Sequence, residues 1–150
     1  MGAAGVRRAE RRDGPRLTEL MLEYTVGFYR QPEPPAEAMD RLLEALYEGR
    51  DGVQLVAELD GDLVGFATLY FTWSSFTGTR IAIMNDLYVV EAHRGSGVAA
   101  SLFDACLEEC RARGLTEMTW ETAPDNHRAQ RFYEKVGGRR EDWLVYGIEP

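Results

Sequence analysis

The order of the predicted elements places this chain in the mixed α+β class. Two amphipathic helical stretches lie near the start, three strand patterns follow them, and further strands then alternate with helices. Asp60-Gly61 marks a tight hairpin between two of the strands. We therefore predict an α+β, or mixed α/β, architecture with a partly antiparallel central sheet. The length of 150 residues fits a single domain over residues 1–150.

The first 50 residues contain a short strand and two helices. The strand is predicted over residues 6–9. Apolar residues then recur at helical spacing over residues 15–29, and Asp13 stands at the N-cap position. Prolines between positions 32 and 35 end this helix. A second helix is predicted over residues 35–47, and its apolar face consists of Met39, Leu42, Leu43 and Leu46.

Three strand patterns occupy the middle of the chain. They cover residues 53–59, 63–73 and 80–90, and a loop over residues 73–78 separates the second from the third. In the third strand, regular alternation puts four apolar residues on one face, with Asn85 among them. These four residues are Ile81, Ile83, Leu87 and Val89.

The last third of the chain alternates helices with strands. A helix over residues 97–113 ends at Gly114, where a helix C-cap belongs. A strand over residues 115–121 and a short helix over residues 126–136 follow. A last strand is predicted over residues 142–148.

Composition and charge narrow the function classes. A formal net charge of −8 disfavours a nucleic-acid partner, because phosphate binding needs a basic surface. The same charge favours a cationic small substrate, and it also serves solubility. No stretch approaches the roughly 18 consecutive apolar residues of a membrane helix, and residues 1–6 lack the apolar run of a secretion signal. We therefore expect no membrane partner and a cytoplasmic location.

The two cysteines are four residues apart in the helix over residues 97–113. At that spacing Cys106 and Cys110 lie one turn apart, as small core or boundary hydrophobes. The two histidines, His93 and His127, are distant from them in sequence. We predict no metal site.

A strand, a glycine loop and a helix start follow one another over residues 85–100. Gly95 and Gly97 allow a sharp turn and the close approach of a ligand to the backbone amides. The free N–H groups and the positive dipole end at a helix start attract an anion, and Arg94 adds a charge. The segment indicates a phosphate or pyrophosphate site, with a plain structural turn as the alternative.

Two known phosphate-binding motifs do not fit this loop. A dinucleotide fingerprint needs a third glycine where Ala100 stands, and it needs an acid after the next strand. The Gly-Lys-Ser/Thr of a P-loop is absent.

Two motifs resemble the signatures of the GNAT superfamily of N-acetyltransferases. Arg94-x-x-Gly97-x-Ala99 is similar to the Arg/Gln-x-x-Gly-x-Gly/Ala signature. The second motif lies about thirty residues later and contains Asn126, Ala129, Phe132-Tyr133 and Gly137. The resemblance covers nearly the whole chain. It implies the GNAT fold, in which a central, mostly antiparallel sheet of about seven strands is flanked by four helices.

The resemblance also implies acetyl-CoA as co-substrate. In GNAT enzymes the fourth and fifth strands splay apart, and the pantetheine arm lies between them. By similarity, one strand would bind pantetheine through its backbone, and one of its N–H groups would polarise the thioester carbonyl. These backbone groups belong to Leu87, Tyr88 and Val89. The pyrophosphate would bind at Arg94, Gly95, Ser96, Gly97, Val98, Ala99 and Ala100. Asn126 and Ala129 would line the other side of the cofactor.

Three residues are candidates for proton transfer. By similarity, the Tyr133 phenol would lie near the cofactor's sulfur and protonate the leaving thiolate; the alternative is a core tyrosine on the apolar stripe of its helix. The acceptor amine, with a pKa of about 10, must lose a proton before it attacks. Asp86 and Glu121, on adjacent strands near the splay, are the candidate bases, directly or through water. Either acid could instead pair with an arginine. Asp86 faces away from Leu87 and Val89 in a regular strand, and a bulge would change that.

The acceptor pocket is the least defined part of the predicted site. The segment Asn85-Asp86-Leu87-Tyr88-Val89 resembles that of spermidine/spermine N-acetyltransferases, except that Asn85 replaces the glutamate that those enzymes use toward a cationic substrate. The loop before this strand could shape the pocket through Trp73, Ser75 and Phe76. Alternatively, these aromatic residues pack on a neighbour or a second subunit.

We predict an acetyl-CoA-dependent N-acetyltransferase that acts on a primary amine of a small molecule. The amine would attack bound acetyl-CoA directly, in a ternary complex. The alternatives are a protein or peptide N-acetyltransferase and a non-catalytic acyl-CoA-binding regulatory module. A homodimer is expected from similar proteins.

Overall fold

The computed structural model describes residues 2–150, which form two compact units. The first unit ends at Trp120 and the second begins at Glu121. The elements of the first unit are β1 (Gly5–Arg8), η1 (Arg11–Asp13), α1 (Gly14–Leu22), η2 (Glu23–Phe28), α2 (Ala36–Glu48), β2 (Gly52–Leu59), β3 (Asp62–Ser74), β4 (Thr79–Val89), η3 (Glu91–His93), α3 (Val98–Ala112) and β5 (Met118–Thr119). The second unit contains α4 (His127–Lys135).

One sheet organises the first unit. Its strand order is β1-β2-β3-β4-β5, and every pairing is antiparallel except the parallel contact of β4 with β5. The β2–β3 hairpin turns at Asp60 and Gly61, whose φ angles of 51° and 82° suit a tight primed turn. The predicted mixed α/β class is confirmed, and the sheet formed by the described residues 2–150 has five strands in place of about seven.

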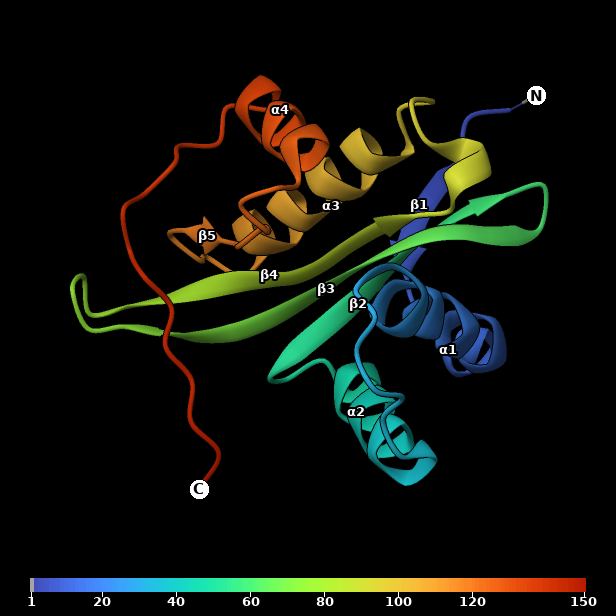
Figure 1. The fold of residues 1–150 in the computed structure, drawn as a ribbon, viewed down its shortest axis with the longest axis horizontal. Coiled ribbons are helices and arrows are strands. Elements are labelled where there is room, and N and C mark those ends of the chain that lie inside the picture. The colour runs from blue at the N-terminus through green and yellow to red at the C-terminus, as the bar shows by residue number, and fades with distance from the viewer. Residues whose placement is uncertain (1) are drawn as a thin grey trace. The chain divides into compact units, whose positions relative to one another are not determined.

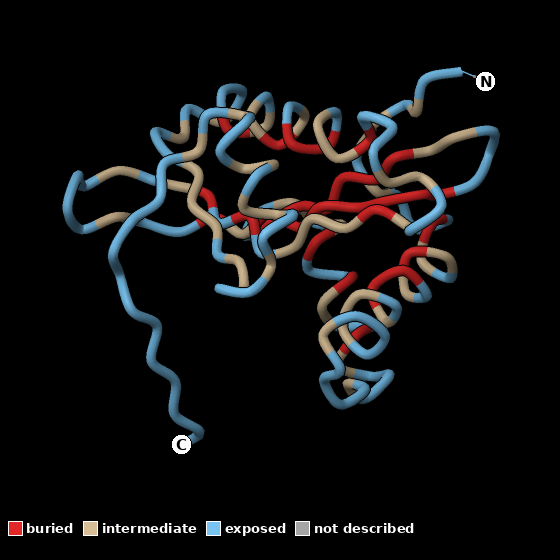
Figure 2. Tube along the Cα trace, turned by 45° about the horizontal axis from the view of Figure 1, so that its top comes forward, coloured by how far each residue is buried: buried red, intermediate tan, exposed pale blue. Residues whose placement is uncertain are grey.

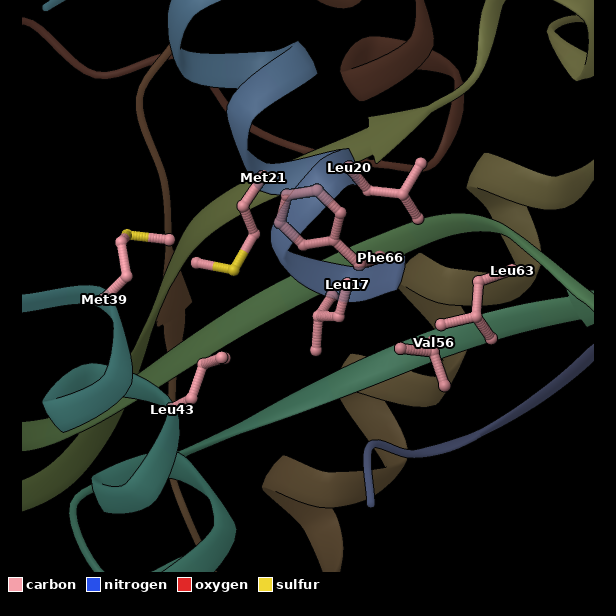
Figure 3. Packing of buried hydrophobic residues seen from close by; sticks show 8 residues of the cluster. All are labelled: Leu17, Leu20, Met21, Met39, Leu43, Val56, Leu63 and Phe66. Carbon is pink, nitrogen blue, oxygen red and sulfur yellow. The ribbon is translucent and has the colours of Figure 1, made fainter. Parts of the chain in front are cut away.

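Helices cover both faces of this sheet (Figure 1). α1 and α2 lie on one face and α3 lies on the other. Figure 3 shows the cluster under α1 and α2, in which side chains from both helices meet the sheet residues Val56, Leu63 and Phe66. The helix side chains of this cluster are Leu17, Leu20, Met21, Met39 and Leu43. The apolar residues that recur at helical spacing in these two helices therefore supply the side chains that pack on the sheet.

The central strands are buried over most of their length (Figure 2). Burial on both faces explains why β2 and β3 read as nearly continuous apolar runs. Two polar residues interrupt these runs, and both are almost inaccessible: Gln54 is 2% exposed and Thr68 is 0% exposed. Buried polar side chains are costly unless they are hydrogen-bonded, so this pair marks a special point of the sheet.

A β-bulge interrupts β4 at Asn85. Thr68 pairs with Asp86 while the next β3 residue, Leu69, pairs with Met84, so Asn85 has no partner in the β3 ladder. One extra residue reverses the alternation of side chains. The prediction that Ile81 and Ile83 share a face with Leu87 and Val89 is therefore wrong, because the two pairs lie on either side of the bulge.

The helix predicted over residues 15–29 changes its winding partway. α1 continues without interruption into η2, which has π-helical hydrogen bonding. Asp13 precedes α1 as predicted, but its side chain makes no cap bond to the helix. Its carboxylate instead accepts from Arg7, at 2.7 and 2.8 Å, and from the Glu10 backbone N–H at 2.7 Å. It therefore ties the start of the helix to β1.

Two strand predictions near the C-terminus are wrong in extent. The strand predicted over residues 115–121 is reduced to β5, which pairs only with Ala82 and Ile83. Residues 142–148 form no strand, and all of residues 139–150 are exposed. Backbone pairing needs a partner edge, which apolar content alone does not supply. None of the helices within residues 2–150 combines the length and apolar character required to cross a bilayer.

The second unit is built around α4. Asn126 caps its start by accepting a hydrogen bond from the Ala129 N–H at 3.2 Å. Its end forms a Schellman motif, in which Gly138 N–H donates to Tyr133 C=O at 2.8 Å and Gly137 adopts a φ of 94°. Local capping signals thus define both ends of this helix.

Candidate active site

Within the first unit, the outer edge of β4 has no strand partner beyond the short β5. Among residues 2–150, β5 covers this edge only at Ala82 and Ile83. The Tyr88 carbonyl lies against Gly65 of β3. Because backbone groups alternate along a strand, Leu87 and Val89 direct their N–H and C=O groups to the open edge. These residues were predicted to bind pantetheine, and the geometry provides the edge that such an added strand would need.

Asp86 lies in β4 directly before Leu87, the first of the residues that face this edge. The bulge places it directly opposite Thr68. Its carboxylate accepts hydrogen bonds from the side chains of Thr68, Tyr24 and Asn85, the last at 3.1 Å. Burial raises the pKa of the Asp86 carboxyl above its ordinary value, and the three hydrogen bonds partly offset this effect. A desolvated carboxylate with neutral donors is a suitable proton acceptor.

Aromatic rings from η2 and the sheet surround this carboxylate. Tyr24 makes edge contacts with Phe66 and Tyr88, at centroid distances of 5.9 and 5.8 Å. The Tyr88 hydroxyl donates to Glu23 at 3.1 Å, and burial raises the pKa of the Tyr88 phenol. η2 thus supplies both Tyr24 and Glu23, which is consistent with the frequent occurrence of π-helical turns at functional sites.

The glycine loop presents free amides at the start of α3. Gly95 and Gly97 have φ angles of 76° and 89°, which disfavour any other residue type. The first α-helical bond runs from Ser101 N–H to Gly97 C=O, so the N–H groups of residues 98–100 have no acceptor within the helix. Apart from the two chain neighbours of each glycine, no described residue has an atom within 4 Å of a Cβ built on Gly95 or Gly97. Free amides beside open space fit a pyrophosphate.

Arg94 connects the loop to the end of β4. Its Nε donates to the Val89 carbonyl at 3.0 Å. Its guanidinium lies over the rings of Phe28 and Tyr88, at 5.8 and 5.7 Å from their centroids. These contacts give Arg94 a role in holding the loop, and its predicted contact with the pyrophosphate stays a prediction.

The remaining cofactor and proton-transfer candidates belong to the second unit. Tyr133 is half-buried in α4, and its ring lies 5.5 Å from that of Phe132. Asn126 and Ala129 are joined by the cap bond at the start of α4. Glu121 is exposed and lies two residues beyond the end of β5, so its predicted place on a strand is wrong. The functional roles of these four residues stay predictions.

The predicted acceptor residues do not gather in one place. Trp73 lies five residues along β3 from Thr68, which is roughly 16 Å in an extended strand. Ser75 and Phe76 lie in the turn that follows β3, and the rings of Trp73 and Phe76 are largely exposed. Asn85, by contrast, contacts Asp86 directly. Of the four residues predicted for the acceptor, the structure brings only Asn85 to the carboxylate.

Four residues near Asp86 were missed in the sequence. Tyr24 lay within a helical apolar stripe and Tyr70 within a strand run, so neither stood out. Gln54 and Thr68 did leave a signal, because each is a polar residue inside a run predicted to be buried. That Gln54 and Thr68 are cross-strand partners could not be predicted without the strand register.

The cysteines are buried in α3, as predicted. Cys106 is 0% exposed and Cys110 is 5% exposed, and both are free thiols. Burial raises the pKa of the Cys106 thiol to about 12. A protonated, inaccessible thiol is a poor nucleophile.

Known proteins resemble this chain over nearly its whole length, in sequence and in structure. The chain is 32% identical over 141 residues to the uncharacterized N-acetyltransferase YhfO of Bacillus subtilis (strain 168), covering 94% of this chain and 93% of that protein. It is 31% identical over 134 residues to the D-amino-acid N-acetyltransferase HPA3 of Saccharomyces cerevisiae, covering 87% and 82%. A crystal structure of a probable acetyltransferase superposes with a TM-score of 0.82 at 28% identity, with 97% of each chain covered.

The family relationship rests on sequence as well as on fold. The model of the acetyltransferase (GNAT) family matches residues 15–138, which include most of α1, all of β4, the glycine loop and α4. The chain therefore belongs to the GNAT family of acetyltransferases, whose members use acetyl-CoA as their co-substrate.

Proposed function

We propose that this enzyme transfers the acetyl group of acetyl-CoA to a primary amine of a small molecule, by direct attack of the amine. The observation that carries the proposal is Asp86, a desolvated carboxylate beside the open edge of β4. An ammonium substrate must lose a proton before it can attack, and in this proposal the Asp86 carboxylate accepts it. The similarity to a D-amino-acid N-acetyltransferase supports a small amine as the acceptor.

Each group of the chain then has one task. Acetyl-CoA supplies the activated acetyl group. The amides of residues 98–100 would hold its pyrophosphate, and the Leu87 N–H, directed to the open edge, would polarise the thioester carbonyl. Asp86 would take the proton of the amine, and Tyr133 would protonate the leaving thiolate. The buried Cys106 and Cys110 take no part, which is consistent with direct attack.

The first experiment measures free-thiol release from acetyl-CoA. Polyamines, D- and L-amino acids, aminoglycosides and short peptides serve as acceptors. Turnover with a small amine supports the proposal. Turnover with peptides alone overturns it in favour of a protein N-acetyltransferase. If acetyl-CoA raises the melting temperature but no amine of this panel is acetylated, acetyl-CoA binding stands, and the search moves to other acceptors, other acyl groups or a regulatory role.

Asp86→Asn tests the proton acceptor. We expect kcat to fall by roughly 10²- to 10⁴-fold, the usual contribution of a positioned base, while the stabilisation by acetyl-CoA stays unchanged. Asp104→Asn is the matched control, because Asp104 is exposed on α3 and the chemical change is identical. Wild-type turnover in Asp86→Asn would assign proton removal to another group, with Glu121 as the next candidate.

Two further properties belong to the same proposal. A homodimer and a cytoplasmic location were predicted from the sequence, and both stay predictions. Sedimentation of the purified protein tests the first, and fractionation of the cells that express it tests the second.

A further inference from the structure

Three polar side chains stand opposite one another across three adjacent strands. Gln54 in β2 is the direct partner of Thr68 in β3, and Thr68 is the direct partner of Asp86 in β4. The row lies on the α1 side of the sheet, where Gln54 contacts Met21 and Asp86 contacts Tyr24. Without the bulge at Asn85, side-chain alternation would turn Asp86 to the opposite face.

The hydrogen bonds along this row have one direction. The Gln54 Nε2 group donates to Thr68 Oγ1 at 3.1 Å, and it also contacts Met21 Sδ at 3.4 Å. An amide nitrogen can only donate, so the Thr68 oxygen is the acceptor in this bond. The single proton of the Thr68 hydroxyl is then left for the Asp86 carboxylate. Donation into a hydroxyl also strengthens its own donation.

We propose that Gln54 and Thr68 are positioning residues that hold Asp86 ready to accept the proton of the amine. The inference rests on the proposed function, because it takes Asp86 as the base. In this proposal Gln54 and Thr68 contact neither the amine nor acetyl-CoA and act through the Asp86 carboxylate. Thr68 fixes the orientation of Asp86, and Gln54 fixes the direction of the Thr68 hydroxyl.

Stability alone does not account for the row. The Gln54 Oε1 atom is buried and has no hydrogen-bond partner among the described residues. Leaving a buried acceptor unpaired destabilises a fold, whereas an apolar side chain of similar volume would not carry this cost. A polar residue that lowers stability and points along the row to Asp86 fits a role in tuning the carboxylate.

The other groups that face Asp86 are neutral at ordinary pH. They are Tyr24 from η2, Tyr70 from β3 and Asn85 at the bulge. Tyr88, the next residue on the same face of β4, donates to Glu23 of η2. Burial therefore raises the pKa of Asp86, and hydrogen bonds from neutral groups oppose it. Removal of the Thr68 bond should raise this pKa further.

The test compares Thr68→Val with Thr68→Ser. Valine keeps the shape of threonine without the hydroxyl, and serine restores the hydroxyl. For Thr68→Val we expect the acid limb of the kcat/KM profile to move to higher pH, with about a tenfold loss of rate on that limb and little change on the plateau. Thr68→Ser should restore the wild-type profile. Thr72→Val is the matched control, because Thr72 lies exposed on the same face of β3.

A carboxyl NMR titration gives a second readout that needs no acceptor. Aspartate is labelled with ¹³C at the carboxyl carbon, and Asp86→Asn identifies the signal. Its midpoint should move to higher pH in Thr68→Val, and to a smaller extent in Gln54→Met. Gln54→Met should also melt no lower than the wild type, which separates tuning from a structural role.

The outcomes distinguish this inference from the proposed function. If Asp86→Asn abolishes turnover but Thr68→Val leaves both the profile and the titration unchanged, the positioning role is wrong and the base stands. If Asp86→Asn turns over normally, the base and the inference both fail. If Thr68→Val does not fold, the titration of Gln54→Met decides, and an unmoved midpoint overturns the inference.

Discussion

Asp13 and Asp86 are the same residue type in opposite electrostatic settings. Asp13 is 7% exposed, and the Arg7 guanidinium holds the pKa of its carboxyl below the ordinary value. Asp86 is desolvated among neutral donors, and burial raises the pKa of its carboxyl. A carboxylate paired with arginine is a structural anchor, whereas one that holds its proton more tightly is suited to proton transfer.

The Arg7–Asp13 pair predicts how stability depends on pH. A depressed pKa means that the contribution of Asp13 is complete above its unfolded pKa, near pH 4, and is lost as the pH falls through the folded value. Asp13→Asn should therefore lower the free energy of unfolding by about 2 kcal/mol at pH 7, because it removes the nearer charged partner of Arg7 and leaves only the longer contact with Glu58 at 3.5 Å. The difference from wild type should shrink below about pH 4.

Urea unfolding at pH 7 and at low pH measures this difference. Arg12 provides a control, since its ion pair with Glu10 is largely exposed and Arg12→Met should change stability little at either pH. A constant gap between Asp13→Asn and wild type across the pH range would show that the Asp13 contribution is not ionic.

Substitution of Cys106 tests whether the acetyl group is transferred directly or through a thiol of the enzyme. Its buried thiol, with a pKa raised to about 12, is protonated and inaccessible. Cys106→Ala should leave kcat and the KM for acetyl-CoA within about twofold of wild type, and should cost about 1 kcal/mol of stability for the lost packing. Complete loss of turnover in a folded variant would instead indicate an acyl-enzyme route.

At the level of elements, the sequence predicted what is locally encoded. The Asp60-Gly61 turn and the Gly114 helix end depend on residues within a few positions, and both are confirmed. From the sequence, a bulge was considered only because it would change the direction of Asp86, and its position at Asn85 was not predicted. A bulge is fixed by the register of β4 against β3, which is a tertiary property.

The same distinction between local and tertiary features explains which parts of the candidate site could be predicted from the sequence. The glycine loop could be predicted, because two glycines directly before a helix indicate an anion-binding turn without any information from distant residues. The row of Gln54, Thr68 and Asp86 comes from three strands separated in sequence, so no spacing rule reveals it. Residues 142–148 give the opposite case: their composition is typical of a strand, but they form no strand.

The glycine loop gives a prediction at this scale. Gly97→Ala adds a methyl group to the space beside the free amides and imposes a left-handed φ on alanine, at a cost of about 1–2 kcal/mol. We expect acetyl-CoA to bind at least about tenfold more weakly, because the pyrophosphate loses its close approach. Equilibrium dialysis with acetyl-CoA measures the change.

Gly61→Ala separates strain from ligand contact. Gly61 has a similar φ of 82° and equally open surroundings, but it lies in the β2–β3 turn. It should lose comparable stability and keep the affinity of the wild type for acetyl-CoA. Equal affinity loss in both variants would assign the effect to strain, and unchanged binding in Gly97→Ala would remove the loop from the cofactor site.

At the scale of the whole molecule, we expect the net charge to favour cationic acceptors over zwitterionic ones. The chain carries a formal charge of −8, so its field attracts cations and repels anions over distances near the Debye length, about 10 Å at 0.1 M salt. A polyamine carries several positive charges, whereas an amino acid at neutral pH has a net charge near zero. The two acceptor types should therefore respond differently to ionic strength.

The salt dependence of kcat/KM for the acceptor provides the measurement, with acetyl-CoA held at saturation so that its own anionic binding does not contribute. Between 20 and 300 mM salt, kcat/KM for a polyamine should fall several-fold, roughly as expected for electrostatic steering. For a D-amino acid it should change by less than about twofold, because a zwitterion has little net attraction to lose. Equal salt dependence for both would show that the field of the whole molecule does not guide the acceptor. Discrimination would then lie in the contacts around Asp86.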